Sequence, residues 1–319
     1  MKFLITGGSG FVGSHLTEKL LELDHEVVVI DNISTGSVEN LMSLRKHLKF
    51  HLVIDTILNS KTSEKLIQEC DFIYHLAAAV GVKLIVNDPV NTIETNIRGT
   101  EVVMHYANKW RKPVLLTSTS EVYGKNTNDT FSESDDMVLG ATTHSRWSYA
   151  CSKAIDEFLA ISYHRKNKLP TIVARLLNTV GPRQSAQYGM VLPTFVQQAL
   201  ENRPITVYGT GTQTRTFTYI DDVVSALVAL PQHEKAFGEV FNIGGIDQIS
   251  IMDLARMVKQ KAGSSSEIVT IPYDKAYEPG FEDMQRRVPN IQKISSFIGY
   301  KPTHHLPQIV DKVIQYFRS

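Results

Sequence analysis

Cysteine is scarce in this sequence, which has only Cys70 and Cys151 among its 319 residues. The two form no CxxC pair and belong to no Cys/His cluster with metal-ligand spacing, so the sequence argues against a disulfide framework and a structural zinc site. We therefore expect no metal ion in this protein. Such sparse cysteine usage is typical of a reducing compartment.

Long apolar runs and an excess of charge of one sign are also missing. No segment reaches the roughly 20 apolar residues of a membrane-spanning helix, and the first apolar stretch, residues 3–5, is far too short for a signal peptide. Lys plus Arg and Asp plus Glu number 33 each, so no overall field attracts nucleic acid or an anionic membrane. We expect a cytoplasmic protein without these partners, in which local cations or backbone amides hold any anionic ligand.

What the sequence does have is an alternation of short β-branched runs with longer amphipathic segments, which is typical of a parallel sheet covered by helices. The expected strands are residues 2–6, 26–30, 49–53, 72–75, 113–117 and 171–175. The expected helices between them lie near residues 10–23, 63–69, 90–108 and 147–166. Six β/α repeats predict an α/β fold with a doubly wound parallel sheet, the Rossmann fold, over residues 1–176.

The character of the chain changes after residue 176. A Gly-, Pro-, Arg- and Gln-rich loop leaves the sheet, and further helices are expected near residues 191–201, 251–262 and 305–317. We interpret residues 177–319 mainly as a smaller C-terminal substrate-binding lobe, with residues of about 216–246 returning to the first domain. Such a lobe would close over the carboxyl ends of the strands, where ligands bind in this architecture.

A glycine motif follows the first predicted strand. Gly7 permits a tight turn, Gly10 lets the backbone approach a pyrophosphate, and Gly13 allows close packing of helix and strand. The helix that follows offers unpaired amides to the phosphates. Asp31, 18 residues beyond Gly13, can accept hydrogen bonds from the adenosine ribose and would repel a 2′-phosphate. A glycine turn without a ligand is the alternative, but the strand before it and the helix after it favour bound NAD.

Tyr149 and Lys153 are four residues apart at the start of a predicted helix, so both side chains lie on one face. A nearby ammonium lowers the pKa of a phenol, which normally titrates near ~10, so Tyr149 can take a proton from a sugar alcohol while NAD takes the hydride. An isolated pair of this kind is also compatible with a solvated helix surface. Thr119 and Glu121, at the end of the fifth strand, favour chemistry because Thr119 can orient the alcohol and Glu121 can exchange a second proton.

These motifs resemble the extended short-chain dehydrogenase/reductase family over nearly the whole chain. Further matching segments are Asp31-Asn32 with Ser34-Thr35-Gly36, His75-Leu76-Ala77-Ala78, Asn96-Ile97-Arg98-Gly99-Thr100, and residues 175–183, 207–215 and 241–244. The resemblance implies a sugar-nucleotide epimerase, dehydratase or decarboxylase with NAD as cofactor and Thr119, Tyr149 and Lys153 as catalytic residues. It also implies a homodimer paired through the helices near 90–108 and 147–166.

The resemblance and the glycine motif together give a set of cofactor-binding residues. The set is Gly7, Gly10, Phe11, Val12, Gly13, Asp31, Asn32, Ser34, Thr35, Gly36, Asp55, Thr56, Leu76, Ala77, Ala78, Asn96, Thr117, Tyr149 and Lys153. Asp55 is expected to contact the adenine. The corresponding substrate-binding residues are Ser120, Arg146, Asn178, Val191, Tyr208, Arg215 and Arg287.

Three features bear on which sugar reaction is catalysed. Glu121 favours a proton step at C5, Arg146 precedes the tyrosine by three residues, and residues 280–290, with Arg287, look like the C-terminal arginine segment of UDP-glucuronate decarboxylases. An arginine fork suits a carboxylate, although Arg287 can equally bind only the diphosphate. We predict a UDP-glucuronate decarboxylase that forms UDP-xylose or a UDP-4-keto-pentose. A 4-epimerase, a 4,6-dehydratase and a non-enzymatic NAD-binding regulator remain alternatives.

Overall fold

The computed structural model describes residues 1–81, 88–186, 189–276 and 283–319. Its main sheet contains seven parallel strands in the order β11-β6-β5-β4-β1-β2-β3. The strands are β1 (Lys2–Thr6), β2 (Glu26–Asp31), β3 (Phe50–Ile54), β4 (Phe72–His75), β5 (Val114–Thr119), β6 (Thr171–Leu176) and β11 (Val240–Ile243). The strand order reverses between β1 and β4, which is the point where a doubly wound sheet binds its ligand.

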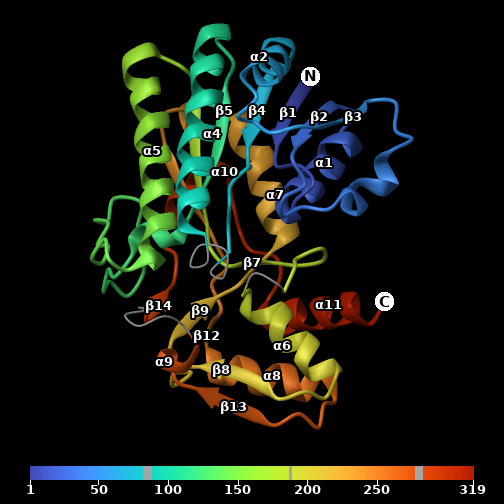
Figure 1. The fold of residues 1–319 in the computed structure, drawn as a ribbon, viewed down its shortest axis with the longest axis vertical. Helices are drawn as coiled ribbons and strands as arrows, with labels where there is room; N and C mark the ends of the chain where they lie inside the picture. Colours follow the sequence, from blue (N-terminus) through green and yellow to red (C-terminus); the bar gives the residue numbers. More distant parts are fainter. Residues whose placement is uncertain (82–87, 187–188, 277–282) are drawn as a thin grey trace.

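Helices cover both faces of this sheet (Figure 1). On one face lie α2 (Ser60–Glu69), α4 (Pro89–Trp110) and α5 (Ser148–Asn167), and on the other lie α1 (Phe11–Glu22) and α7 (Ile220–Ala229). The strands are apolar on both sides because side chains alternate: Phe3 and Ile5 pack under α1, whereas Leu4 packs on the opposite face. The predicted doubly wound sheet is confirmed, and β1 and β4 have the predicted bounds.

A smaller lobe occupies the lower half of Figure 1. Its helices are α6 (Val191–Leu200), α8 (Ile251–Ala262), α9 (Tyr273–Ala276) and α11 (Leu306–Arg318), and α10 (Gln292–Ile298) packs against β11. Its strands pair as β8 (Ile205–Tyr208) with β13 (Ile268–Ile271), and as β9 (Thr214–Thr216) with β12 (Gln248–Ser250) and β14 (Arg286–Arg287). A short pair, β7 (Thr179–Val180) with β10 (Thr218–Tyr219), joins the two parts of the chain. The domain boundary at residue 176 stays a prediction.

Two properties of the described ranges bear on the expected ligands. No helix in them is both long and apolar enough to cross a membrane. Side chains that bind metals do not gather in groups of three or more within those same ranges. Cys70 is buried and Cys151 is exposed, each as a free thiol.

Candidate active site

A cavity of about 330 Å³ lies where the carboxyl ends of β5 and β6 meet the smaller lobe. It brings together residues that are far apart in sequence, from Val80, which follows β4, to Arg287 on β14. All seven predicted substrate-binding residues line it: Ser120, Arg146, Asn178, Val191, Tyr208, Arg215 and Arg287. Of the four predicted catalytic residues, Thr119, Glu121 and Tyr149 line the cavity, and Lys153 lies outside its wall.

The glycine turn between β1 and α1 has the shape of a phosphate cradle. A Cβ atom on Gly7 would lie 2.7 Å from the Ala77 amide nitrogen, and one on Gly13 would lie 2.3 Å from the Gly7 carbonyl oxygen. Gly10 caps α1 without a side-chain hydrogen bond, so the first amides of the helix are available to an anion. Phe11 and Val12 form the first turn of that helix. These features fit the pyrophosphate of a dinucleotide.

Asp31 lies beside this turn at the carboxyl end of β2. Its carboxylate accepts hydrogen bonds from the amides of Ser9 and Ile33, both at 2.8 Å. Burial raises the pKa of Asp31, and the two amide donors offset part of that rise. Each carboxylate oxygen keeps a second lone pair for a ribose hydroxyl. The next predicted residues, Asn32, Ser34, Thr35 and Gly36, follow directly, and Gly36 packs against the backbone of Ser9.

The other predicted cofactor residues follow neighbouring strands. Leu76, Ala77 and Ala78 leave β4, where the Ala77 amide donates to Thr6 Oγ1 at 3.2 Å. Asn96 on α4 accepts from the Ala79 amide at 2.8 Å, and Thr117 on β5 donates to the carbonyl of His75 at 3.3 Å. These contacts keep the chain close to the glycine turn at the switch point of the sheet.

Asp55 and Thr56 lie at the end of β3. The Asp55 carboxylate accepts hydrogen bonds from the Thr56 amide and from the side chains of Asn59 and Thr62 at 2.7–2.8 Å. These donors lower the pKa of Asp55, with Thr62 as the largest cause. Asp55 therefore stabilises the start of α2 in this structure, and its predicted contact with adenine stays a prediction.

The Tyr149 phenol lies within hydrogen-bonding reach of Thr119, as a base and an orienting hydroxyl should. The expectation that Lys153 lowers the pKa of Tyr149 is not met here. Burial raises the pKa of Tyr149, and the carboxylates of Glu121 and Asp156 raise it further. The Lys153 ammonium is 2.8 Å from Asp156 Oδ2, which offsets its charge. At neutral pH the free protein therefore holds Tyr149 as the neutral phenol.

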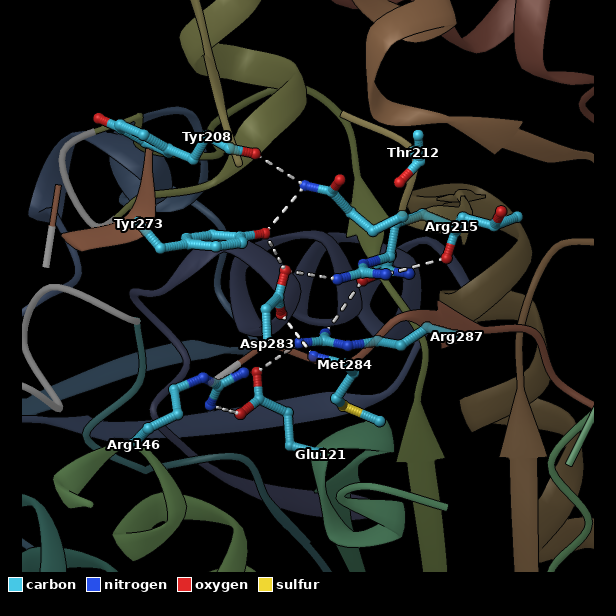
Figure 2. Close-up of polar contacts among 12 residues, drawn as sticks. Glu121, Arg146, Tyr208, Thr212, Arg215, Tyr273, Asp283, Met284 and Arg287 are labelled. Atoms are coloured by element: carbon cyan, nitrogen blue, oxygen red, sulfur yellow. Dashed lines mark hydrogen bonds and ion pairs between the residues drawn. The ribbon is translucent and has the colours of Figure 1, made fainter. Parts of the chain in front are cut away.

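Glu121 lies between two arginines at the floor of the cavity (Figure 2). It forms ion pairs with Arg146 and with Arg287, the second at 2.9 Å. Burial favours a higher pKa for Glu121, but the charges of Arg146 and Arg287 outweigh it and lower the pKa to about 2. Glu121 is thus ionised at neutral pH, and in the free protein it is a hydrogen-bond acceptor and not a proton donor.

A second ion pair lies deeper in the smaller lobe. Arg215 donates to Asp283 at 2.9 Å, and Tyr273 donates to the same carboxylate oxygen at 3.1 Å (Figure 2). Burial lowers the pKa of Arg215 to about 10, so it keeps its charge at neutral pH. Asp283 and Tyr273 also line the cavity, and neither was predicted from the sequence to do so. Asp283 belongs to the segment 280–290 picked out for Arg287, of which residues 280–282 lie outside the described ranges.

The short strand β14 explains why these groups meet. It pairs in parallel with β9, and this register sets Arg287 opposite Arg215. Arg287 also donates to Asn178 Oδ1 at 3.2 Å. Asn178 has a φ of 43°, in the left-handed region that asparagine adopts more readily than branched residues. One pairing between segments about 70 residues apart thus places both cationic side chains on one cavity.

Comparison with known proteins identifies the family of this site. Residues 4–313 match the family described as GDP-mannose 4,6 dehydratase. The chain belongs to this family. Its members are extended short-chain dehydrogenase/reductase enzymes that use NAD to modify sugar nucleotides, which confirms the predicted resemblance and cofactor.

Individual members of the GDP-mannose 4,6-dehydratase family are similar over the full chain. A UDP-N-acetyl-alpha-D-glucosaminuronate decarboxylase of Bacillus cytotoxicus is 40% identical over 99% of this chain and 97% of its own length. UDP-glucuronic acid decarboxylase 1 of Xenopus tropicalis is 36% identical over 100% of this chain and 72% of its own length. Among solved structures, a Bacillus cereus UDP-glucuronic acid 4-epimerase in complex with UDP-glucuronic acid and NAD superimposes with a TM-score of 0.89. It is 32% identical, and the match covers 100% of this chain and 99% of the epimerase.

Proposed function

We propose that this protein is a UDP-glucuronate decarboxylase that acts through a 4-keto intermediate. The observation that carries the proposal is the pair formed by Arg146, which is buried, and Arg287, which is partly buried, on either side of Glu121 in the cavity wall. Arg287 Nε is buried and hydrogen-bonds no atom of the described residues, and the same is true of the Ser120 hydroxyl. Buried donors of this kind require partners, and a sugar carboxylate and a sugar hydroxyl supply them.

The chemistry begins at the C4 hydroxyl of the sugar. Tyr149 would take the hydroxyl proton as the phenolate, a form that the positive charge of bound NAD⁺ would favour, and Thr119 would hold the oxygen. Bound NAD would supply the hydride acceptor. The resulting ketone is β to the C5 carboxylate. When the bond between C5 and the carboxylate breaks, its electron pair moves toward the ketone, carbon dioxide leaves, and C5 later takes a proton. Bound NAD would also supply the hydride that converts this ketone to UDP-xylose, and release of the ketone without that reduction would give the UDP-4-keto-pentose.

Glu121 has two roles in this proposal. In the free protein it holds the guanidinium groups of Arg146 and Arg287 in place and balances their charge. When the substrate carboxylate forms an ion pair with Arg287, Glu121 loses one of the two cations that lower its pKa. It then becomes able to exchange a proton at C5. A substrate without a carboxylate leaves Glu121 ion-paired with both arginines, so Glu121 cannot exchange a proton. The site is therefore expected to favour uronates over neutral hexoses as substrates.

The nucleotide end of the substrate is assigned to the other side of the cavity. Arg215 is suited to a phosphate oxygen, and Val191 on α6 and Tyr208 on β8 provide walls for a pyrimidine. We further propose that the cofactor set predicted from the sequence binds NAD. The cytoplasm is the proposed compartment, on the basis of the sparse cysteines.

A second substrate is favoured by one observation. The Bacillus cytotoxicus relative, at 40% identity, is named for a UDP-sugar acid with an N-acetyl group. UDP-N-acetylglucosaminuronate has the same C4 hydroxyl and C5 carboxylate, so the proposed chemistry applies to it unchanged. A 4-epimerase acting on UDP-glucuronate is the remaining enzymatic rival, given the Bacillus cereus structure.

The deciding experiment incubates the purified protein and NAD separately with UDP-glucuronate, UDP-N-acetylglucosaminuronate and UDP-glucose. We expect stoichiometric release of carbon dioxide from a uronate and a pentose product by NMR, with UDP-glucose unchanged. Conversion of UDP-glucuronate to UDP-galacturonate without release of carbon dioxide would show an epimerase instead. Turnover of UDP-glucose would contradict the role given to the two arginines.

We also propose that two copies of the chain pair through α4 and α5, which lie side by side at the edge of the molecule (Figure 1). Four apolar side chains on these helices are exposed: Val90 and Ile93 on α4, and Ile155 and Phe158 on α5. Phe158 is 62% exposed, which is costly for so large an apolar side chain on a monomer. Pairing of two such faces removes them from water.

Replacing Phe158 with Glu is expected to convert the dimer to monomers, because a charge at the centre of an apolar interface loses its hydration. The measurement is the molar mass by light scattering at several protein concentrations. Leu48→Glu is the matched control, since Leu48 is 94% exposed and lies far from α5 in sequence. A dimer that survives Phe158→Glu would place the interface elsewhere.

A further inference from the structure

One face of α5 carries a third polar residue besides Tyr149 and Lys153. Asp156 is seven residues after Tyr149 and three after Lys153, which places all three on one side of the helix. Asp156 is fully buried, and Lys153 is 2% exposed. The Lys153 ammonium donates to Asp156 Oδ2 at 2.8 Å. The lysine that is predicted to serve the cofactor and Tyr149 is therefore paired with a carboxylate inside the protein.

A buried chain of polar side chains runs from beside this carboxylate to the cofactor turn. The Thr100 hydroxyl on α4 faces Asp156 and is 3.0 Å from His75 Nε2 on β4. His75 Nδ1 is in turn 2.7 Å from Thr6 Oγ1, which accepts from the Ala77 amide beside the glycine turn. Burial, together with the Lys153 charge, lowers the pKa of His75 to about 3, so the imidazole is neutral. In this buried group of polar side chains, the cation is therefore Lys153 and the anion is Asp156.

We propose that Asp156 is a positioning residue for Lys153, which fixes the ammonium below the cavity and offsets the positive charge that it presents to Tyr149 and to the cofactor. A buried lysine without this partner would leave an uncompensated charge in a low-dielectric region. With the partner, the pair is close to neutral. The electrostatic state of Tyr149 is then set mainly by its burial and by the groups on the cavity side.

The charged and titratable groups around this face come from several elements. Glu157 adjoins Asp156 on α5, but it binds Arg175 at 2.7 Å and accepts a hydrogen bond from Ser118. His75 approaches from β4, and Glu121 and Arg287 act on Tyr149 from the cavity. Among these groups Asp156 is the carboxylate paired with Lys153. Removing the charge of Asp156 should therefore leave the Lys153 ammonium without a counter-charge. The uncompensated ammonium should lower the pKa of Tyr149 and oppose binding of a cationic nicotinamide.

The test compares Asp156→Asn with Glu157→Gln, a buried carboxylate on the same helix whose partners are not catalytic. We expect Asp156→Asn to move the acidic limb of the pH–kcat profile to lower pH by roughly half to one unit, because a buried carboxylate raises the pKa of a nearby phenol. We also expect it to weaken binding of NAD⁺ roughly five-fold relative to NADH, since only NAD⁺ carries the ring charge. Glu157→Gln should lower the melting temperature and change neither readout.

This inference rests on the proposed function only in the pH–kcat profile, which has to be measured with the proposed substrate. The ratio of NAD⁺ to NADH dissociation constants, measured by calorimetry, needs no substrate and remains informative if the proposed reaction is wrong. An unchanged ratio together with an unchanged pH profile would make Asp156 a structural residue and overturn the proposal. If Asp156→Asn does not fold, Asp156→Ser removes the same charge from a smaller side chain and is judged by the same two readouts.

Discussion

Tyr149→Phe is expected to lower kcat by roughly 10³–10⁴-fold, near the upper end of what a positioned acid–base group contributes. The substitution removes one oxygen, the group that takes the C4 proton, and keeps the ring that packs in the cavity wall. Without a base, oxidation of the sugar stops, and neither NADH nor carbon dioxide should form. Because the glycine turn and Asp31 are untouched, the dissociation constant for NAD should change little. The measurements are a single-turnover assay at 340 nm and a calorimetric NAD titration.

Tyr123→Phe is the matched control for this experiment. Tyr123 is also a buried phenol, and it donates to Asn242 at 2.7 Å, outside the wall of the cavity. Its loss should cost about 1 kcal/mol of stability, as for a typical buried hydrogen bond, and leave kcat near that of the parent protein. Substantial turnover by Tyr149→Phe would remove Tyr149 from the mechanism, and an equal loss in both variants would indicate damage to the fold.

Arg287→Met is expected to lower kcat/KM for UDP-glucuronate by roughly 10²–10³-fold, because truncating one partner of a buried hydrogen-bonded charge pair costs about 2–5 kcal/mol. Methionine keeps much of the side-chain volume but offers no donor to a carboxylate. The loss should appear mainly as a higher KM if Arg287 only binds the substrate. A fall in kcat in addition would show that Arg287 also acts in the chemical step. Steady-state kinetics with carbon dioxide detection separate the two.

The neighbouring residue provides an internal control. Arg286 is also on β14, but its side chain is 44% exposed and pairs with Asp129, itself 93% exposed. Exposed pairs of this kind contribute about 0–1 kcal/mol, so Arg286→Met should leave kcat/KM within about two-fold of the parent value. Equal losses in Arg286→Met and Arg287→Met would point to β14 as a structural element and not to a carboxylate site.

The strands and most helices could be predicted because each leaves a local signature. Val27 to Ile30 form a continuous apolar run, as expected of a strand that is buried on both faces, and the predicted helix at 251–262 has the bounds of α8. The strand β11 was not predicted as a separate element. It contains only four residues and takes its place at the edge of the sheet by pairing with β6, a contact with no local period.

The candidate site likewise contains features that the local sequence predicts and features that it does not. The glycine turn, Asp31 and the Tyr149/Lys153 spacing are local patterns, because the backbone geometry that they require is set within one turn or one helix. The sequence alone was therefore enough to predict a dinucleotide-binding sheet and a candidate site built on a tyrosine. It also pointed to Arg146 and Arg287, through the resemblance to UDP-glucuronate decarboxylases and because an arginine fork suits a carboxylate.

Which partner each of these charges has was decided by the tertiary structure. Glu121 and Arg287 are 166 residues apart, and Arg215 and Asp283 are 68 apart. They meet because β14 pairs with β9 across the cavity. Asp156 is only three residues from Lys153, yet the packing of α4 against α5 buries it and makes it offset the lysine charge. Charge pairs depend on distance and burial in space, and neither quantity follows from spacing along the chain.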